Sequence, residues 1–294
     1  MTSITVQTPA KINLLLDVKG KREDDYHLIS SVFQAVDICD TLTVSRREGQ
    51  KITLSSSNRF LPCSPKNIAY QAATALLKAT NTTCGLHIHI EKHIPSQAGM
   101  GGGSSDGAAV LVALNQLLGL GLHPKALCNI GAGIGADIPF FLLGGTVLVE
   151  GIGERLTPLH ALPPMPLVVA KGKAGVSTPE AYRKIDALKH PRHPDTEAML
   201  QAVDRQNLPA LADACGNLFE QAIQLEEVDS IRSIMRQNGA SCAVMTGSGS
   251  AVFGLCTSQS VAQTCCNALH AAAIPYAVTC KTLECGIRIL QTED

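Results

Sequence analysis

Tryptophan is absent from this chain of 294 residues, and aromatic residues make up only 3% of it. With so few large rings, the core must be filled mainly by aliphatic side chains and alanine. An aromatic residue close to the surface is therefore more informative here than in most proteins. Tyr26 and Tyr182 stand out for this reason.

An excess of charge of either sign is also absent, since the formal net charge is −1. No run of Lys and Arg is longer than a pair, so no strong field attracts nucleic acid or an anionic membrane. The apolar runs fall short of the ~20 residues that span a bilayer. Residues 1–6 lack the charged start and long apolar core of a secretion signal. We therefore expect a cytoplasmic protein without nucleic-acid or membrane partners.

Paired cysteine motifs are missing as well. The chain has eleven cysteines, but none forms Cys-x-x-Cys, and they are scattered from Cys39 to Cys285. Without a secretion signal, this distribution does not indicate a disulfide framework. The cysteines are expected to be small buried hydrophobic residues.

The sequence also gives no support for two familiar nucleotide-binding motifs. No Gly-Lys pair is followed by Ser or Thr, so the P-loop is excluded. Residues 131–136 match the dinucleotide pattern Gly-x-Gly-x-x-Gly/Ala, but they follow a helix-like stretch. The strand and the acidic residue that should frame that pattern are missing. It stays a minor alternative.

What the chain does contain is a run of glycines placed directly before a helix, within residues 95–109. Glycines let backbone N–H groups turn toward a ligand, and the N-terminus of a helix attracts anions. Ser104, Ser105 and Asp106 are common N-cap types, and residues 108–118 are expected to form the helix, ending before Gly119. This segment predicts a bound phosphate.

Hydrophobic periodicity divides the first half of the chain into strands and helices. We expect separate strands at 4–8 and 12–18, hairpin-linked strands at 41–45 and 51–55, and strands at 86–90 and 145–150. A helix is expected over 67–78, capped by Ser64 with Pro65 in its first turn.

The Pro-rich stretch 159–167 is the predicted domain connection, which divides the chain into domains 1–158 and 167–294. The second part is expected to begin with a strand at 167–170, to contain helices at 197–205 and 208–222, and to end in strands. It carries its own glycine-containing loop at 245–253. Strands and helices mix without strict alternation, which predicts an α+β fold.

Lys11 and Asp137 are the candidate catalytic pair. Both lie in apolar or glycine-rich runs, where a charged side chain is unusual. Taken singly, each has a plainer explanation, a surface lysine and a turn carboxylate. Beside a phosphate site they suit phosphoryl transfer to a hydroxyl: the carboxylate orients the alcohol and accepts its proton, while the lysine supports the developing charge.

Two further clusters allow a structural or a functional interpretation. His87, His89, Glu91 and His93 alternate along one face of a strand, and we expect a solvated face opposite buried apolar residues rather than a metal site. The pair Tyr26-His27, on a turn-rich segment, suits stacking and edge hydrogen bonding to a base, although such pairs more often only pack.

Together these motifs resemble the GHMP kinases, the family of galactokinase, homoserine kinase and the mevalonate kinases. The resemblance runs from about residue 8 to 253 and is carried by residues 9–14, 20–27, 98–106, 135–140 and 246–250. It implies a two-domain GHMP kinase fold with the active site in a cleft between the domains. The glycine-rich loop and the Tyr-His segment are specific to members that phosphorylate a cytidine diphosphate alcohol. The implied reaction transfers a phosphoryl group from ATP to the 2-hydroxyl of 4-diphosphocytidyl-2-C-methyl-D-erythritol, in non-mevalonate isoprenoid precursor synthesis.

The resemblance assigns roles to individual residues. Lys11 and Asp137 are the implied catalytic pair, and Asn13, Tyr26, His27 and Tyr182 the implied substrate site, with Tyr26 and Tyr182 on the two faces of the cytosine. The implied ATP site consists of Asn67, Lys92, Pro95, Ser96, Gln97, Ala98, Gly99, Met100, Gly101, Gly102, Gly103, Ser104 and Ser105. The reaction class implies Mg²⁺, for which the sequence assigns no ligand beyond a weak case for Ser105. The expected oligomeric state is a monomer or homodimer.

The chain departs from the family pattern at four positions. Met100 replaces a Leu of similar volume, Gly107 replaces an Ala, and Glu23 and Asp25 replace Pro and Gly before Tyr26. Asp tolerates the left-handed backbone conformation better than most residues, so the turn is expected to survive.

Two other functions remain in competition. A kinase with the same fold acting on homoserine or mevalonate would leave Tyr26, His27 and Tyr182 unexplained. A nucleotide-binding module without catalysis would predict a damaged Lys11 or Asp137, and both are present.

Overall fold

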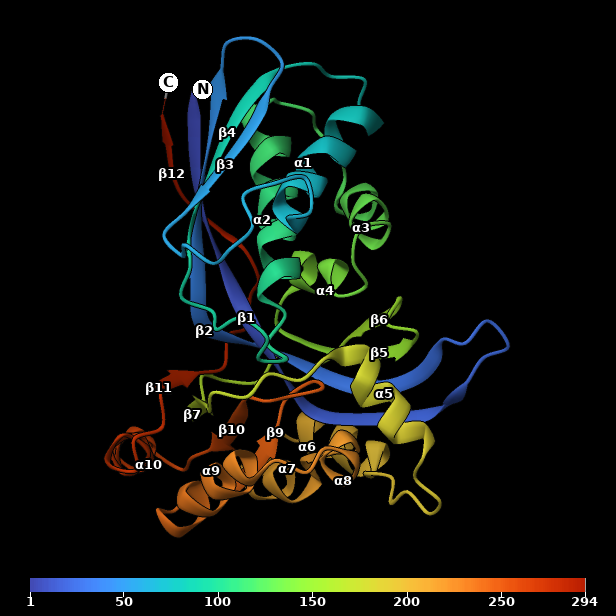
Figure 1. Ribbon diagram of the computed structural model, residues 1–294, viewed down its shortest axis with the longest axis vertical. Coiled ribbons are helices and arrows are strands. Elements are labelled where there is room, and N and C mark those ends of the chain that lie inside the picture. Colours follow the sequence, from blue (N-terminus) through green and yellow to red (C-terminus); the bar gives the residue numbers. More distant parts are fainter. Residues whose placement is uncertain (294) are drawn as a thin grey trace.

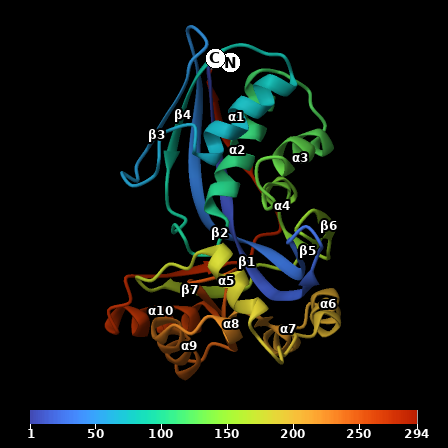
Figure 2. The ribbon, with the colours of Figure 1, turned by 45° about the vertical axis from the view of Figure 1, so that its right-hand side comes forward.

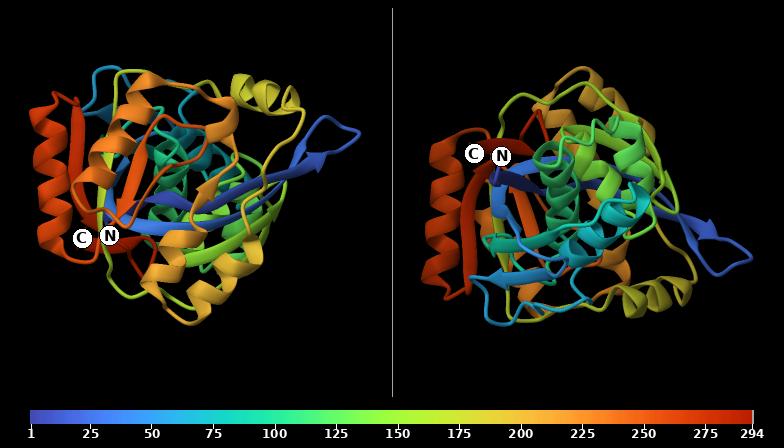
Figure 3. Two further views of the ribbon diagram at one scale, coloured as in Figure 1. Left: turned by 90° about the horizontal axis from the view of Figure 1, so that it is seen from below. Right: turned by 90° about the horizontal axis from the view of Figure 1, so that it is seen from above.

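Two long antiparallel strands form the central structural element of the molecule (Figure 1). The computed structural model describes residues 1–293. Strand β1 (Ser3–Lys21) pairs with β2 (His27–Arg47) along nearly its whole length. The turn that joins them projects beyond the rest of the molecule, as both views of Figure 3 show.

The first sheet is built outward from this pair, in the order β12-β1-β2-β4-β3. Strands β5 and β6 extend it from β2, and the short β8 pairs in parallel with β1. The remaining strands of this sheet are β3 (Ile52–Ser56), β4 (Gly85–Glu91), β5 (Thr146–Gly151), β6 (Arg155–Pro158), β8 (Gly216–Asn217) and β12 (Arg288–Glu293). The C-terminal strand thus returns to the sheet in which the chain begins.

Four helices cover one face of this sheet (Figure 2). They are α1 (Ile68–Ala79), α2 (Gly102–Leu117), α3 (Pro124–Ala132) and α4 (Ile138–Leu143). Their alanine-rich apolar faces and the inward side chains of the strands form one aliphatic core, in which Phe33, Phe140 and Phe141 are the aromatic members. Small alanines let the helices approach one another closely, so the low aromatic content is consistent with the packing.

A second, smaller sheet lies at the other end of the molecule, with the strand order β11-β7-β10-β9 and antiparallel pairing throughout. Its strands are β7 (Pro166–Lys171), β9 (Cys242–Met245), β10 (Val252–Leu255) and β11 (Tyr276–Lys281). The accompanying helices are α5 (Thr178–Asp186), α6 (Thr196–Asp204), α7 (Leu208–Ala214), α8 (Phe219–Ala222), α9 (Glu226–Gln237) and α10 (Gln259–Ala271). The expected α+β class is confirmed.

A core shared by the two sheets joins them. Buried residues of β1 and β2, such as Ile12 and Val32, pack in one cluster with residues of β7 and β10, such as Val169 and Phe253. Helices α6 and α7 contribute Met199 and Leu211 to the same cluster. The Pro-rich stretch between β6 and β7 crosses from the first sheet to the second, where the domain connection was predicted.

Two strand predictions were wrong. The expected strands at 4–8 and 12–18 are one strand, because the pairing of β1 with β2 continues through a register shift between Pro9 and Ala10. A bulge accommodates a proline that cannot donate to the ladder. The expected hairpin of 41–45 with 51–55 does not form, since β4 lies between β2 and β3, and β3 runs parallel to β4.

Three helix predictions also needed correction. Helix α1 is capped by Asn67, whose side chain accepts from the N–H of Ala69, and not by Ser64. Helix α2 begins at Gly102 behind the left-handed Gly101, so the supposed cap residues Ser104, Ser105 and Asp106 lie inside it. The expected helix 208–222 is divided into α7, β8 and α8. The helix expected at 197–205 is confirmed as α6.

No helix within residues 1–293 combines the length and the apolar character needed to cross a membrane.

Helix α3 allows a test of why residues 131–136 are rich in glycine. A Cβ added at Gly131 would lie 2.4 Å from Cγ2 of Ile138, whereas one added at Gly133 would meet nothing nearer than 3.5 Å. Because a branched side chain beside α4 cannot easily move, Gly131→Ala should destabilise the protein by about 1–3 kcal/mol through overpacking. The matched control Gly133→Ala should change the free energy of unfolding by less than about 0.5 kcal/mol. Denaturant unfolding measures both, and equal effects would contradict this explanation.

Candidate functional site

Three adjoining cavities run from the glycine-rich loop to the projecting β1–β2 turn. The first lies over residues 95–104 and the second contains Lys11 and Asp137, and they share Gly99 and Gly101. The third contains Tyr26 and His27 and shares Thr178 and Tyr182 with the second. Their volumes are about 270, 280 and 420 Å³, respectively.

The glycine-rich loop is held between the two sheets by backbone contacts. The N–H of Lys11 donates to the carbonyl of Met100 at 3.1 Å, and the N–H of Ala251 donates to the carbonyl of Ala98 at 3.3 Å. Gly99 has φ of +73°, and a Cβ there would lie 2.1 Å from the carbonyl oxygen of Thr246. Only glycine fits this position. The loop therefore places the N-terminus of α2 at the first cavity, where an anion is favoured.

Lys11 is a buried cation in the second cavity, with 4% of its surface exposed. Its Nζ donates to Oδ1 of Asn13 at 2.7 Å and lies 4.4 Å from the ring centroid of Phe33. Burial lowers the pKa of Lys11, and the negative charge of Asp137 opposes that shift. Register shifts in β1 on both sides of Lys11 are typical of strands that direct a side chain into a site.

Asp137 lines the same cavity and stands directly before α4. Its carboxylate makes no hydrogen bond and no ion pair within 4 Å among residues 1–293, and it does not cap α4. A free carboxylate facing a buried ammonium is suited to bind and deprotonate a hydroxyl. The structure thus brings the two predicted catalytic residues together.

Asn13 also lines this cavity, but its side-chain amide is committed to the protein. Oδ1 accepts from Nζ of Lys11, from the N–H of Gly247 at 2.8 Å and from Oγ1 of Thr246 at 3.0 Å. Nδ2 donates to Oγ of Ser31 at 2.9 Å. Asn13 therefore orients Lys11 and docks the second glycine-containing loop, and its contact with substrate remains a prediction.

At the third cavity, the predicted sandwich of Tyr26 and Tyr182 is not preformed. Tyr26 is 59% exposed. Tyr182 stacks instead on His27, with ring centroids 4.4 Å apart and an interplanar angle of 22°, and it packs edge-on against Phe219. Burial raises the pKa of Tyr182 to about 12, so its hydroxyl stays protonated.

The structure separates the predicted ATP residues into two groups. Lys92 and residues 95–104 line the first cavity, whereas Asn67 and Ser105 do not. Asn67 uses its side chain to cap α1 and to donate to the carbonyl of Pro62. The hydroxyl of Ser105 is fully buried, donates to the carbonyl of Pro9 at 2.7 Å and also hydrogen bonds with Thr8, so Ser105 supports the loop from behind.

Lys92 lies between two carboxylates beneath the loop. Its ammonium contacts Asp40 and lies 2.8 Å from Oδ2 of Asp106. Asp40 also accepts from the N–H groups of His93 and Ile94, whereas Oδ1 of Asp106 is buried without a partner in the described part of the chain. One lysine cannot neutralise two carboxylates. Burial of the carboxyl group raises the pKa of Asp106 to about 8. The charge of Lys92, which Asp106 shares with Asp40, opposes this shift only in part.

Sequence reasoning missed Asp106, Thr178, Gly247 and Ser248 as residues of the cavities. The glycine-containing loop 245–253 was noted but given no role. Asp106 had a usable signal, an acidic residue at the start of an otherwise apolar helix. Thr178 had none, because its position depends on how α5 packs.

Three of the four departures from the family pattern can be related to the structure, whereas nothing in it explains Glu23. Asp25 adopts the expected left-handed conformation, with φ of +68°, and its carboxylate pairs with Lys21 at 2.8 Å. Met100 is buried. A Cβ at Gly107 would lie 2.8 Å from Cγ2 of Ile68, so this chain packs α1 closer than an alanine at 107 would allow.

The structure bears on two alternative sites considered from the sequence, a metal site on β4 and a dinucleotide site at residues 131–136. His87 and His89 hydrogen bond with Thr53 and Ser55 of β3, while the intervening residues of β4 face the core, as expected. No group of three or more His, Cys, Asp or Glu within residues 1–293 is arranged to hold a metal ion. Residues 131–136 begin in the last turn of α3 and follow no strand, which is inconsistent with a dinucleotide site.

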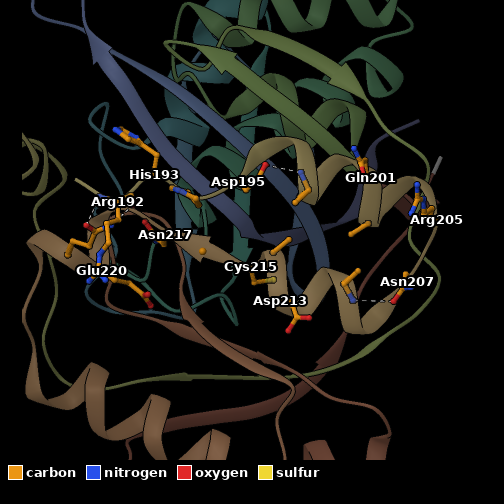
Figure 4. A pocket seen from close by; sticks show the side chains of 17 residues that line it. Arg192, His193, Asp195, Gln201, Arg205, Asn207, Asp213, Cys215, Asn217 and Glu220 are labelled. Carbon is orange, nitrogen blue, oxygen red and sulfur yellow. Dashed lines mark hydrogen bonds between the residues drawn. The ribbon is translucent and has the colours of Figure 1, made fainter. Parts of the chain in front are cut away.

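A larger cavity, of about 620 Å³, lies away from this chemistry, among α6, α7 and α8 (Figure 4). None of the predicted site residues lines it. Asn217 and Glu220 at its wall hold the backbone of residues 245–247 by hydrogen bonds to Met245 and Gly247. Size alone therefore does not identify the active site.

Comparison with protein families gives two matches. Residues 67–145 match the GHMP kinases N terminal domain, and residues 199–274 match the GHMP kinases C terminal family. Both segments line the cavities described above: the first contains the glycine-rich loop and Asp137, and the second contains Gly247 and Ser248.

Curated relatives cover most of the chain. A 4-diphosphocytidyl-2-C-methyl-D-erythritol kinase of Caldicellulosiruptor bescii is 43% identical over 248 residues, covering 84% of this chain and 87% of that protein. One of Geobacillus thermodenitrificans is 42% identical, covering 91% and 93%.

Solved structures of kinases are also similar to this chain over most of its length. A crystal structure of 4-(cytidine 5'-diphospho)-2C-methyl-D-erythritol kinase is 36% identical with a TM-score of 0.80, covering 95% of this chain and 98% of that one. Homoserine kinase from Cytophaga hutchinsonii has the same TM-score at 20% identity, covering 99% and 98%, which shows a shared fold.

Asp106 provides a test of the charge balance beneath the loop. Its pKa in the folded protein, about 8, is raised above the usual 3.8, so folding favours the protonated form. The stability that this contributes is fully present below pH 3.8 and is lost as the pH rises through about 8. Asp106→Asn keeps a neutral group of the same shape, so the variant should gain stability relative to wild type as the pH rises from about 4 to about 8. Urea unfolding at several pH values measures this, with Asp213→Asn, a change at an exposed aspartate, as the control. Parallel pH profiles for wild type and Asp106→Asn would contradict the assignment.

Proposed function

Because the chain belongs to the GHMP kinases, within the group of 4-diphosphocytidyl-2-C-methyl-D-erythritol kinases, we propose the following reaction for it. It phosphorylates the 2-hydroxyl of 4-diphosphocytidyl-2-C-methyl-D-erythritol with ATP as the donor. This is a step of the non-mevalonate route to isoprenoid precursors. The protein is therefore a phosphotransferase with an alcohol as acceptor.

The observation that carries this proposal is the linear order of the three cavities. The glycine-rich loop lies at one end, Lys11 and Asp137 in the middle, and Tyr26 with His27 at the other end. That order matches donor phosphates, the reacting hydroxyl and a base joined to the alcohol through a diphosphate. A small acceptor such as homoserine would leave the third cavity without a use.

Each part of the middle cavity has a role in transfer. Asp137 orients the acceptor hydroxyl and takes its proton as the oxygen attacks. Lys11, held by Asn13, stabilises the ionised Asp137 and the charge that develops on the transferring group. Gly247, Ser248 and Tyr182 close the cavity and exclude water.

Binding of the two substrates involves the outer cavities. We assign the ATP triphosphate to residues 95–104, with the backbone N–H groups after Pro95 as donors and Lys92 beside Gly102 at the start of α2. We assign the cytosine to Tyr26, His27 and Tyr182. Because Tyr182 stacks on His27 in this structure, the cytosine must either extend that stack or separate the two rings.

Mg²⁺ is the metal that the reaction class implies, and the residues present fit it. This ion takes one or two carboxylates together with phosphate oxygens and water. Asp106 and Asp137 line adjacent cavities. Oδ1 of Asp106 is buried without a partner among residues 1–293, and the carboxylate of Asp137 does not cap α4. When bound, the metal would neutralise charge on the phosphates.

Three further expectations belong to the same proposal. We divide the chain into domains 1–158 and 167–294, with the last strand β12 paired into the first sheet. We propose a cytoplasmic protein that acts as a monomer or homodimer on small molecules.

The acceptor is tested by measuring ADP release with three alcohols. We expect turnover with 4-diphosphocytidyl-2-C-methyl-D-erythritol and little or none with homoserine or mevalonate, because only the first has a base to fill the third cavity. The assay couples ADP formation to NADH oxidation. Turnover with homoserine or mevalonate but not with the cytidine compound would overturn the proposal.

The role of Asp137 is tested by Asp137→Asn, which keeps the shape of the side chain and removes the base. Turnover should fall by at least about 100-fold, since general-base catalysis contributes that much or more. ATP affinity, measured by calorimetry, should stay close to wild type. The matched control Asp229→Asn changes an exposed aspartate on α9 and should leave both unaffected. Near-normal turnover of Asp137→Asn would remove Asp137 from this role.

A further inference from the structure

A carboxylate from the second half of the chain contacts the predicted base-binding histidine. Nε2 of His27, at the start of β2, lies 2.6 Å from Oδ1 of Asp186, the last residue of α5. Both residues line the third cavity. The His27 side chain is nearly buried, with 11% exposed, while that of Asp186 is 38% exposed.

This contact decides which ring nitrogen carries the proton. An ionised carboxylate can only accept hydrogen bonds, so Nε2 must be the N–H donor. Nδ1 of His27 has no hydrogen-bond partner among residues 1–293. In the neutral ring, Nδ1 is then an acceptor with a free lone pair.

The ring is held in place by two further contacts. Tyr182 stacks on one face of His27 and fixes the plane of the ring. Nζ of Lys21 lies 3.6 Å from Oδ2 of Asp186, so that carboxylate stands between two donors. Lys21 is itself paired with Asp25 in the β1–β2 turn. The histidine therefore cannot exchange its two nitrogens without breaking the bond to Asp186.

A fixed acceptor distinguishes cytosine from uracil. Cytosine carries an amino group, a donor, at the position where uracil carries a carbonyl oxygen, an acceptor. An Nδ1 lone pair accepts from the amino group but repels the carbonyl. Discrimination of this kind is strong because the wrong base leaves polar groups unpaired.

We propose that Asp186 is a positioning residue that selects cytosine over uracil by holding His27 with Nε2 protonated and Nδ1 as the acceptor. This rests on the proposed function, because it places the base of the substrate in the third cavity. Asp186 acts through His27 and has no contact with the reacting phosphate.

The test compares binding of CDP and UDP, together with kcat/KM for the cytidine substrate and its uridine analogue. Asp186→Asn should reduce the preference for cytosine by about tenfold or more, because an amide can both donate and accept and so permits either tautomer. KM for the cytidine substrate should rise while kcat changes little. Asp186→Glu should recover part of the preference.

Two controls separate this role from a merely structural one. Glu180→Gln makes the same chemical change on α5 at an exposed residue paired only with Lys184, and should leave the preference unchanged. Lys21→Met removes the second contact of Asp186 but keeps the bond to His27, and should retain most of the preference. The ¹⁵N NMR signals of His27 should show the Nε2–H tautomer in wild type and a mixture in Asp186→Asn.

Three results would overturn the proposal: equal weakening of CDP and UDP binding in Asp186→Asn, no preference in wild type, or an Nδ1–H tautomer in wild type. Calorimetry and NMR require no phosphoryl transfer. A wild-type protein that prefers CDP through Asp186 but does not phosphorylate the cytidine substrate would therefore contradict the proposed function and leave this inference standing.

Discussion

The side-chain amide of Asn13 is the contact on which the active site depends. One oxygen accepts from the ammonium of Lys11, from the hydroxyl of Thr246 and from the N–H of Gly247. These donors come from β1 of the first sheet and from the loop between β9 and β10 of the second. A single buried acceptor thus orients Lys11 and sets the position of the facing loop, and the absence of a Cβ at Gly99 lets the two loops touch backbone to backbone.

Buried charge is arranged differently on the two sides of the glycine-rich loop. Lys11 is held by neutral groups and faces the free carboxylate of Asp137 across a cavity, which leaves that carboxylate available for chemistry. Lys92 is in direct contact with Asp40 and Asp106, so its charge is used within the fold. The first arrangement suits proton transfer. The second leaves one carboxylate oxygen without a partner, next to the site we assign to phosphates.

Local sequence patterns predicted much of this structure because they reflect interactions between residues that are close in the sequence. Period-2 alternation located β4 and β5, a helical pattern located α6, and clustered prolines located the crossing between the sheets. They failed where a distant partner decides the outcome. Pro9 lies within a strand because β2 pairs on both sides of it, and Ser105 turns away from the cavity because Thr8 and the carbonyl of Pro9 compete for its hydroxyl.

The sequence by itself determined the candidates: a phosphate loop, one lysine, one carboxylate and an aromatic-histidine pair, which residue type and local spacing single out and whose roles the family resemblance implies. Tertiary structure alone decided which of these groups are free to act. It placed Asp137 opposite Lys11 without a partner among residues 1–293, and it committed Asn13 and Asn67 to the fold. It also brought Asp186 to His27 across 159 residues of chain. Burial and competition for hydrogen bonds depend on residues that are distant in the sequence, and a local pattern does not identify those residues.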